Sequence, residues 1–63
     1  MTQKEYIKAL NKGLRFKLPK TEIREILADI AECFEEGIAE GLSEDEISIR
    51  LGAPDAAAEE LAA

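Results

Sequence analysis

The sequence contains no histidine and no tryptophan, and its only cysteine is Cys33. Without histidine, the chain lacks the residue used most often in zinc sites and in general acid–base catalysis. One cysteine cannot form a disulfide within the chain, which excludes a disulfide-stabilised secreted scaffold and a cysteine-based metal site. The composition therefore indicates no enzyme, no cofactor and no metal.

Long apolar runs are also absent. No segment approaches the ~20 apolar residues of a membrane span, and the first residues, MTQKEY, lack the apolar block of a signal peptide. A chain of 63 residues forms one small domain that buries only about 60% of its unfolded surface. We expect a single cytoplasmic domain over residues 1–63, and so small a core leaves open a homodimer in which a second copy completes it.

Charge is distributed unevenly along the chain. Residues 1–20 carry six Lys or Arg and one acid, a balance of +5, whereas residues 21–63 carry two basic and thirteen acidic residues, a balance of −11. Nucleic-acid phosphates repel an acidic protein unless its basic part is displayed separately, and direct nucleic-acid binding is not expected. We expect the basic segment to pack beside the acidic one, so that each partly neutralises the other.

The apolar pattern predicts one long amphipathic helix over residues 20–41. At ~100° per residue, nine residues form one continuous apolar arc: Cys33, Ile26, Gly37, Ile30, Ile23, Phe34, Leu27, Ile38 and Ala31. The opposite arc is mostly acidic. This separation predicts that one face of the helix is buried and the other is solvated, and Gly37 in the arc suggests the close approach of another backbone.

Local signals bound the other helices. Thr2 with Glu5, and Ser43 with Glu46, have the spacing of a capping box, and Pro54 suits the first position of a helix. We expect helices at about residues 3–15, 20–41, 44–51 and 54–62.

Four helices with short links predict an all-α fold, a small antiparallel bundle of three to four helices around one long central helix. The first helix and the last two should lean on that central helix. We expect Ala57, Ala58 and Leu61 to face the core from the last helix, and Phe16 and Leu18 to cap it from the first link.

Carboxylates repeat at helical spacing on the outer side of the central helix. A divalent metal site needs ligands that converge from several elements, so we interpret these acids as a solvated surface that attracts a basic protein partner. Cys33 borders them and is expected to be a small buried hydrophobe, or, if exposed, to mark a face that pairs with another helix. The predicted partner-binding residues are Glu25, Asp29, Glu32, Cys33 and Glu36.

Two other segments resemble binding motifs. Residues 43–63 are arranged like a DNA-binding helix-turn-helix, but the second helix, PDAAAEELAA, has three acids and no side chain typical of base or phosphate contacts. The first helix has the basic and apolar sides of an interfacial membrane helix. Its apolar stripe is also needed for the core, so a membrane and the bundle would compete for it.

A set of features in a fixed order spans nearly the whole chain. They are Glu5-Tyr6-Ile7, then Leu18-Pro19 followed by Glu22, Glu25, Asp29, Phe34, Gly37 and Gly41, then Ser43, Glu46-Ile47, Leu51-Gly52 and Pro54. Together they resemble the HAAS family, the helix-turn-helix-associated α-helical signalling domain. Ile30, Cys33 and the length of the link from Leu14 to Leu18 depart from the family pattern.

The resemblance implies a bacterial, non-catalytic signalling domain on the cytoplasmic side of the membrane, often encoded beside a PadR-type transcriptional regulator. It therefore implies a protein partner. The alternative to such an interaction domain is the N-terminal cytoplasmic head of a longer membrane protein, as many members of the family are.

Overall fold

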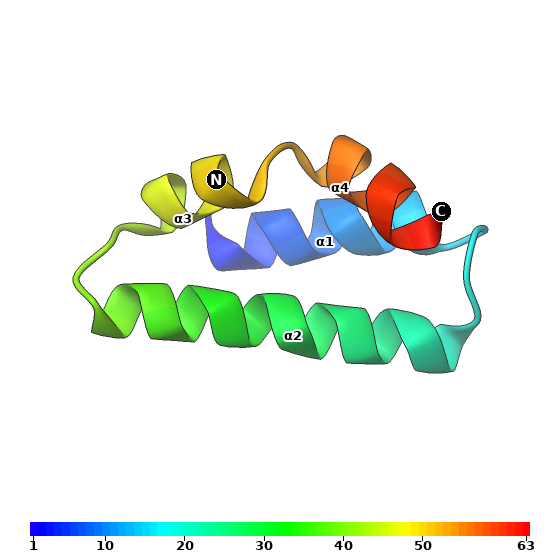
Figure 1. Cartoon of the computed structure of the whole chain (residues 1–63), viewed down its shortest axis with the longest axis horizontal. Coiled ribbons are helices and arrows are strands. Elements are labelled where there is room, and N and C mark those ends of the chain that lie inside the picture. The colour runs from blue at the N-terminus through cyan, green and yellow to red at the C-terminus, as the bar shows by residue number, and fades with distance from the viewer.

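The computed structural model describes residues 1–63 as four helices without strands. They are α1 (Gln3–Leu14), α2 (Lys20–Ala39), α3 (Glu44–Leu51) and α4 (Pro54–Ala62). α1 and α2 run antiparallel, and α3 and α4 return alongside α1 (Figure 1). The predicted all-α fold is confirmed. No helix combines the length and the hydropathy that crossing a bilayer requires.

Capping boxes fix the starts of α1 and α3. Thr2 Oγ1 accepts a hydrogen bond from Glu5 N at 3.2 Å, and the Glu5 carboxylate accepts one from Thr2 N at 2.9 Å. The hydrogen bond that Thr2 N donates holds the pKa of the Glu5 carboxyl below its usual value. Ser43 and Glu46 make the same exchange at α3. Both helices begin where the sequence predicts, because each box satisfies N–H groups that a helix start otherwise leaves unpaired.

α2 ends in a Schellman motif. Gly41 has a φ of +94°, Leu42 N donates to Gly37 O at 2.9 Å, and Gly41 N donates to Ile38 O at 3.0 Å. The helix therefore stops at Ala39, slightly before the predicted limit. The glycine turns the chain toward α3.

The link between α1 and α2 places its two large apolar residues in opposite environments. Leu18 is half-buried against the core, as predicted, but Phe16 is 92% exposed. Lys17 N and Leu18 N both donate to Leu14 O, at 2.9 and 3.2 Å. This turn directs Leu18 inward and leaves Phe16 outside, so the prediction that Phe16 caps the core is wrong.

The centre of the core lies on α1. Tyr6, Leu10 and Leu14 are all 0% exposed, and the rings of Tyr6 and Phe34 pack with centroids 5.6 Å apart at 58°, a geometry that aromatic pairs prefer. The Tyr6 hydroxyl donates a 2.8 Å hydrogen bond to Gly52 O. One side chain thus joins α1 to α2 and to the link before α4. The other core residues are Ile23, Phe34, Ile47 and Ala58.

α4 packs mainly on α1, whereas the sequence pattern predicted packing on α2. A Cβ on Gly13 would lie 2.8 Å from the Cβ of Ala58, so the missing side chain lets α1 and α4 approach this closely. Ala58 is buried and Ala57 half-buried, as predicted. Leu61 is instead 44% exposed, and Ala62 packs inward. The short helix presents its alanines, and not its leucine, to the close α1 contact.

The apolar arc of α2 is only partly covered because α4 lies on α1. Ile23 and Phe34 are buried, but Ile38 is 48% exposed. α3 covers the C-terminal part, where a Cβ on Gly37 would lie 2.6 Å from Ile47 Cδ1. The close approach predicted at Gly37 is thus made by a side chain and not by a backbone. The half-buried members of the arc are Ile26, Leu27, Ile30 and Ala31.

Candidate protein-docking face

A row of carboxylates runs along a side of α2 that stays exposed to solvent. At helical spacing these acids share one side of the helix. The five predicted partner-binding residues are all exposed: Glu25, Asp29, Glu32, Cys33 and Glu36. We use the term acidic row for Glu22, Glu25, Asp29, Glu32, Glu36 and Glu40.

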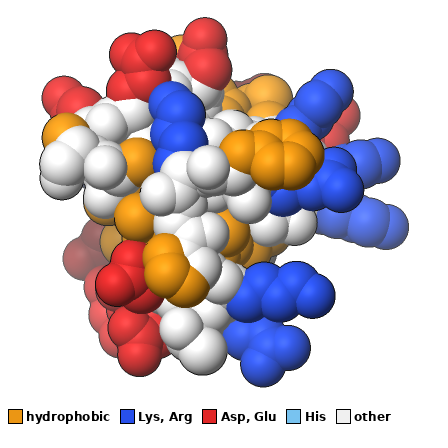
Figure 2. All heavy atoms as spheres, turned by 90° about the vertical axis from the view of Figure 1, so that its right-hand side faces the viewer, with side chains coloured by type: hydrophobic (Ala, Val, Ile, Leu, Met, Phe, Trp, Pro, Cys, Tyr) orange, Lys and Arg blue, Asp and Glu red, His pale blue; other side chains and the backbone are white.

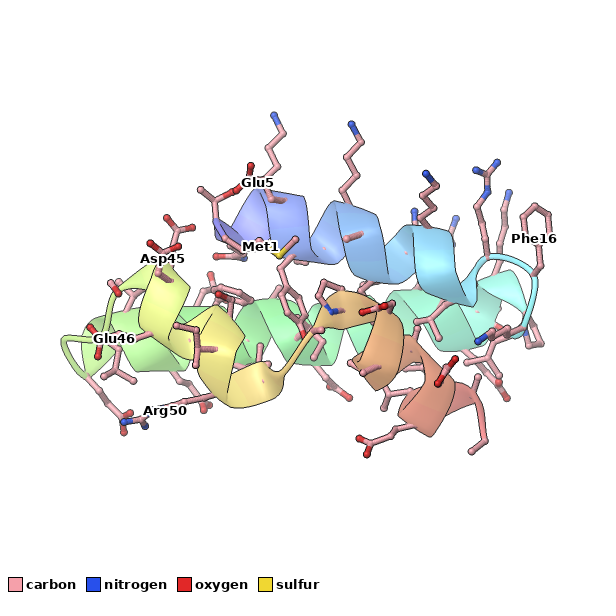
Figure 3. The ribbon with its side chains drawn as sticks, turned by 90° about the horizontal axis from the view of Figure 1, so that it is seen from above. Met1, Glu5, Phe16, Asp45, Glu46 and Arg50 are labelled. Carbon is pink, nitrogen blue, oxygen red and sulfur yellow. The ribbon has the colours of Figure 1, made fainter.

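No basic side chain forms an ion pair with the acidic row. The only ion pair in the structure joins the Met1 amino group to Asp45, on the side of the molecule where α1 begins beside α3 (Figure 3). A hydrogen bond to Asp45 raises the pKa of this amino group. Most Lys and Arg side chains instead gather on one side of the molecule and most Asp and Glu side chains on the other (Figure 2). The neutralisation expected between the two segments is therefore not made by ion pairs, and the row keeps its negative potential.

A groove of about 220 Å³ adjoins the acidic row, between the C-terminal half of α2 and α3. It combines apolar side chains with two carboxylates of the row, Glu36 and Glu40, and with one cation, Arg50. An apolar lining with an acidic rim suits an amphipathic segment that carries basic residues. The residues that line the groove are Cys33, Glu36, Gly37, Glu40, Leu42, Ile47, Arg50 and Leu51.

The groove brings together only two of the predicted partner-binding residues, Cys33 and Glu36. The other three, Glu25, Asp29 and Glu32, lie nearer the N-terminus of α2. They continue the acidic surface beyond the groove, so a partner that spans both would lie along the axis of α2.

Two groove residues, Glu40 and Arg50, were not among the predicted partner-binding residues. Glu40 follows Glu36 by one helical turn, so its spacing could have identified it. Arg50 follows Ile47 on α3, and the packing of α3 on α2, where Ile47 meets Gly37, brings that part of α3 to the groove. Its place in the site could not be read from spacing within a single helix.

Cys33 is exposed, which corrects the expectation of a buried side chain. The residue stands at the boundary between the apolar arc and the acidic row, and α4, which could have covered this edge, packs on α1. Ile26 and Ile30, on the apolar side of the same edge, are half-buried. The edge of α2 therefore presents apolar surface directly beside carboxylates.

The structure places no group of three or more Asp, Glu, His or Cys side chains where they could hold a metal ion. On α4, the three acids of the segment that resembles a recognition helix, Asp55, Glu59 and Glu60, are all exposed. They give that helix a negative surface, which nucleic-acid phosphates repel.

Comparison with known proteins gives one match. The family model HAAS matches residues 5–60 of the 63-residue chain. No curated protein matches the chain, and no solved structure does. The matched segment includes α2, α3, the acidic row and the groove. This chain belongs to the HAAS family.

Proposed function

We propose that this chain is a non-enzymatic protein-interaction domain of bacterial signalling or transcriptional regulation, and that it binds its partner in the cytoplasm through the acidic row and the adjoining groove. The observation that carries the proposal is the uncovered side of α2, where exposed carboxylates without ion pairs adjoin half-buried apolar residues.

The chemistry of this face defines the kind of partner. Ile26, Ile30 and the thiol of Cys33 offer apolar contact, while the acidic row attracts positive charge and steers its approach. An amphipathic helix with lysines or arginines along one edge matches both features. A symmetric contact between the acidic rows of two copies of this chain does not match, because the two rows would repel each other.

The first partner to test is a PadR-type regulator from the same genome, since the family resemblance implies that such regulators accompany these domains. Isothermal titration would compare the wild type with a variant carrying Glu25→Gln, Asp29→Asn, Glu32→Gln and Glu36→Gln. We expect at least about tenfold weaker binding by the variant, because it loses four charges that attract the partner. Higher salt should also weaken binding by the wild type, because it screens the same charges.

A charge-matched control separates the acidic row from the net charge. Glu35→Gln, Asp55→Asn, Glu59→Gln and Glu60→Gln remove four carboxylates that are also exposed but lie outside the row. This control should bind like the wild type. Equal losses in both variants would contradict a role for the row, and no binding by the wild type would contradict the PadR assignment.

The alternative is an N-terminal cytoplasmic head of a longer membrane protein. One observation favours it. The C-terminus lies at the same end of the bundle as the basic α1–α2 link (Figure 1), and juxtamembrane basic residues are typical of the cytoplasmic side. Sequencing the native reading frame beyond Ala63 tests this alternative, which requires an apolar segment long enough to span a bilayer.

A further inference from the structure

Three shallow hollows lie on the side of the bundle that carries most of the lysines and arginines. They adjoin one another and so form one continuous surface. The hollow along α1 and the middle one share Lys8 and Asn11, and the middle one shares Asn11 and Arg15 with the hollow between α1 and the start of α2. Their volumes are about 800, 220 and 400 Å³. We define the basic surface as the cations that line them: Lys4, Lys8, Lys12, Arg15, Lys20 and Arg24.

This basic surface has no internal partner. None of its cations forms an ion pair within the chain, and Glu44 is the only acid that lines any of the three hollows. Nitrogen-tipped side chains extend from α1 away from α3 and α4 (Figure 3). A surface with this much unpaired positive charge on a protein of net charge −6 is suited to an anionic ligand larger than a single ion.

Phe16 projects beside the basic surface, at the extreme end of the molecule (Figure 3). It is 92% exposed, and the Arg15 guanidinium carbon lies 5.5 Å from its ring centroid. A lone exposed apolar residue is ordinary. Phe16, however, lies outside the core, contacts a cation and extends beyond the rest of the bundle. An exposed aromatic ring and an adjacent cation are two features of residues that anchor a protein at a membrane interface.

We propose that Phe16 and the basic surface dock this domain on an anionic lipid bilayer. Phe16 enters the boundary between headgroups and acyl chains, and the flexible lysines and arginines contact lipid phosphates around it. The apolar stripe of α1 takes no part, because Tyr6, Leu10 and Leu14 are in the core. Bundle and membrane therefore do not compete for the same residues. This docking rests on a different face from the acidic row and does not depend on the proposed function.

Two observations favour a lipid surface over an acidic protein. Four of the six cations are lysines, as is the neighbouring exposed Lys17, and lysine is depleted at protein interfaces while arginine is enriched. The charge is also polarised, with acids gathered opposite the cations (Figure 2). When the basic surface faces the bilayer, the acidic row faces away from it, which lowers the repulsion that the net charge would otherwise cause.

Vesicle co-sedimentation of the full chain tests this docking. The probes are vesicles of phosphatidylcholine alone and vesicles of phosphatidylcholine mixed with phosphatidylglycerol. We expect at least about tenfold tighter binding to the anionic vesicles. Raising NaCl from about 0.1 M to about 0.5 M should release most of the protein because salt screens the contacts.

Two matched pairs of variants assign the contacts. Phe16→Ser should weaken vesicle binding about tenfold, whereas Ile49→Ser, which replaces a residue 79% exposed on α3, should have no effect. Arg15→Gln should weaken binding, whereas Arg50→Gln, which removes a cation outside the basic surface, should not. Circular dichroism should show all four variants folded, because each replaced side chain is exposed.

Four results would overturn the docking. They are no binding to anionic vesicles, equal binding to both vesicle types, equal effects within each variant pair, and binding to soluble polyglutamate without binding to vesicles, which would indicate an acidic protein instead. Inorganic phosphate at matched ionic strength should not displace the bound protein. Full displacement by it would be a fifth such result and would indicate a site for the free anion.

Discussion

Replacement of Phe34 with alanine is expected to remove most of the free energy that stabilises the fold at room temperature. Phe34 is 0% exposed, and its ring packs against Tyr6 at 5.6 Å. Removing a buried phenylalanine costs about 3–5 kcal/mol, while small domains lie at the low end of a total stability of about 5–15 kcal/mol. The melting temperature should fall by at least about 12 °C, since each kcal/mol corresponds to ~4–8 °C at this size.

The other phenylalanine provides the control for this prediction. Phe16→Ala removes the same number of atoms from a side chain that is 92% exposed, so stability should change by less than about 0.5 kcal/mol. Thermal unfolding followed by circular dichroism measures both variants. Similar losses in the two would show that the burial described for Phe34 and the exposure described for Phe16 are wrong.

Tyr6 is expected to make the protein sensitive to alkaline pH. Burial raises the pKa of its phenol above the usual value of about 10. Below pH ~10 the phenol is neutral in both states and its contribution to stability is complete. Above that pH the unfolded chain releases the proton while the folded chain retains it, so stability falls by up to about 1.4 kcal/mol per pH unit until the folded pKa is passed.

The effect of Tyr6→Phe on the stability of the protein should therefore change sign as the pH rises. Near neutrality the variant loses the hydrogen bond to Gly52 O and should be about 1 kcal/mol less stable, but it cannot ionise and should become the more stable protein in strong alkali. Denaturant unfolding from neutral to strongly alkaline pH measures the difference in stability between the variant and the wild type. Lysine deprotonation affects both proteins equally and therefore cancels from this difference. Phenolate absorbance reports Tyr6 directly, because the chain has one tyrosine and no tryptophan. A difference that stays constant with pH would contradict the burial of the hydroxyl.

Local signals in the sequence predicted the helices well because they act within a few residues. The Thr2–Glu5 and Ser43–Glu46 boxes form as expected, and the left-handed Gly41 ends α2. Spacing also predicted that the acids of α2 would be exposed. Each of these predictions depends on helical geometry alone.

The packing of α4 could not be read in the same way. The contact between Gly13 and Ala58 depends on two segments far apart in the chain, and a glycine in a helix indicates low helix propensity as readily as a close approach. Cys33 was expected to be buried because it lies at the edge of the apolar arc and free cysteines are usually buried, but no helix covers that edge and the thiol is exposed. Phe16 was misplaced because hydrophobicity alone does not give the direction of a turn.

The two proposed surfaces are compatible with each other. The basic surface and the acidic row occupy different sides of the bundle (Figure 2), so a domain held against an anionic bilayer would still present the row to the proposed protein partner. Each surface has its own test, and a result that contradicts one proposal does not affect the other.

The claim common to this account is that the edge of α2 beside the acidic row is uncovered, and Cys33 reports on that edge. As the only thiol in the chain, it can be followed with the uncharged reagent 4,4′-dithiodipyridine, which the acidic row does not repel, in native buffer and in guanidinium chloride. We predict that the native thiol reacts at a rate within about tenfold of the unfolded one, because no unfolding is needed to expose it. A native reaction that proceeds only at the rate of global unfolding would contradict the account.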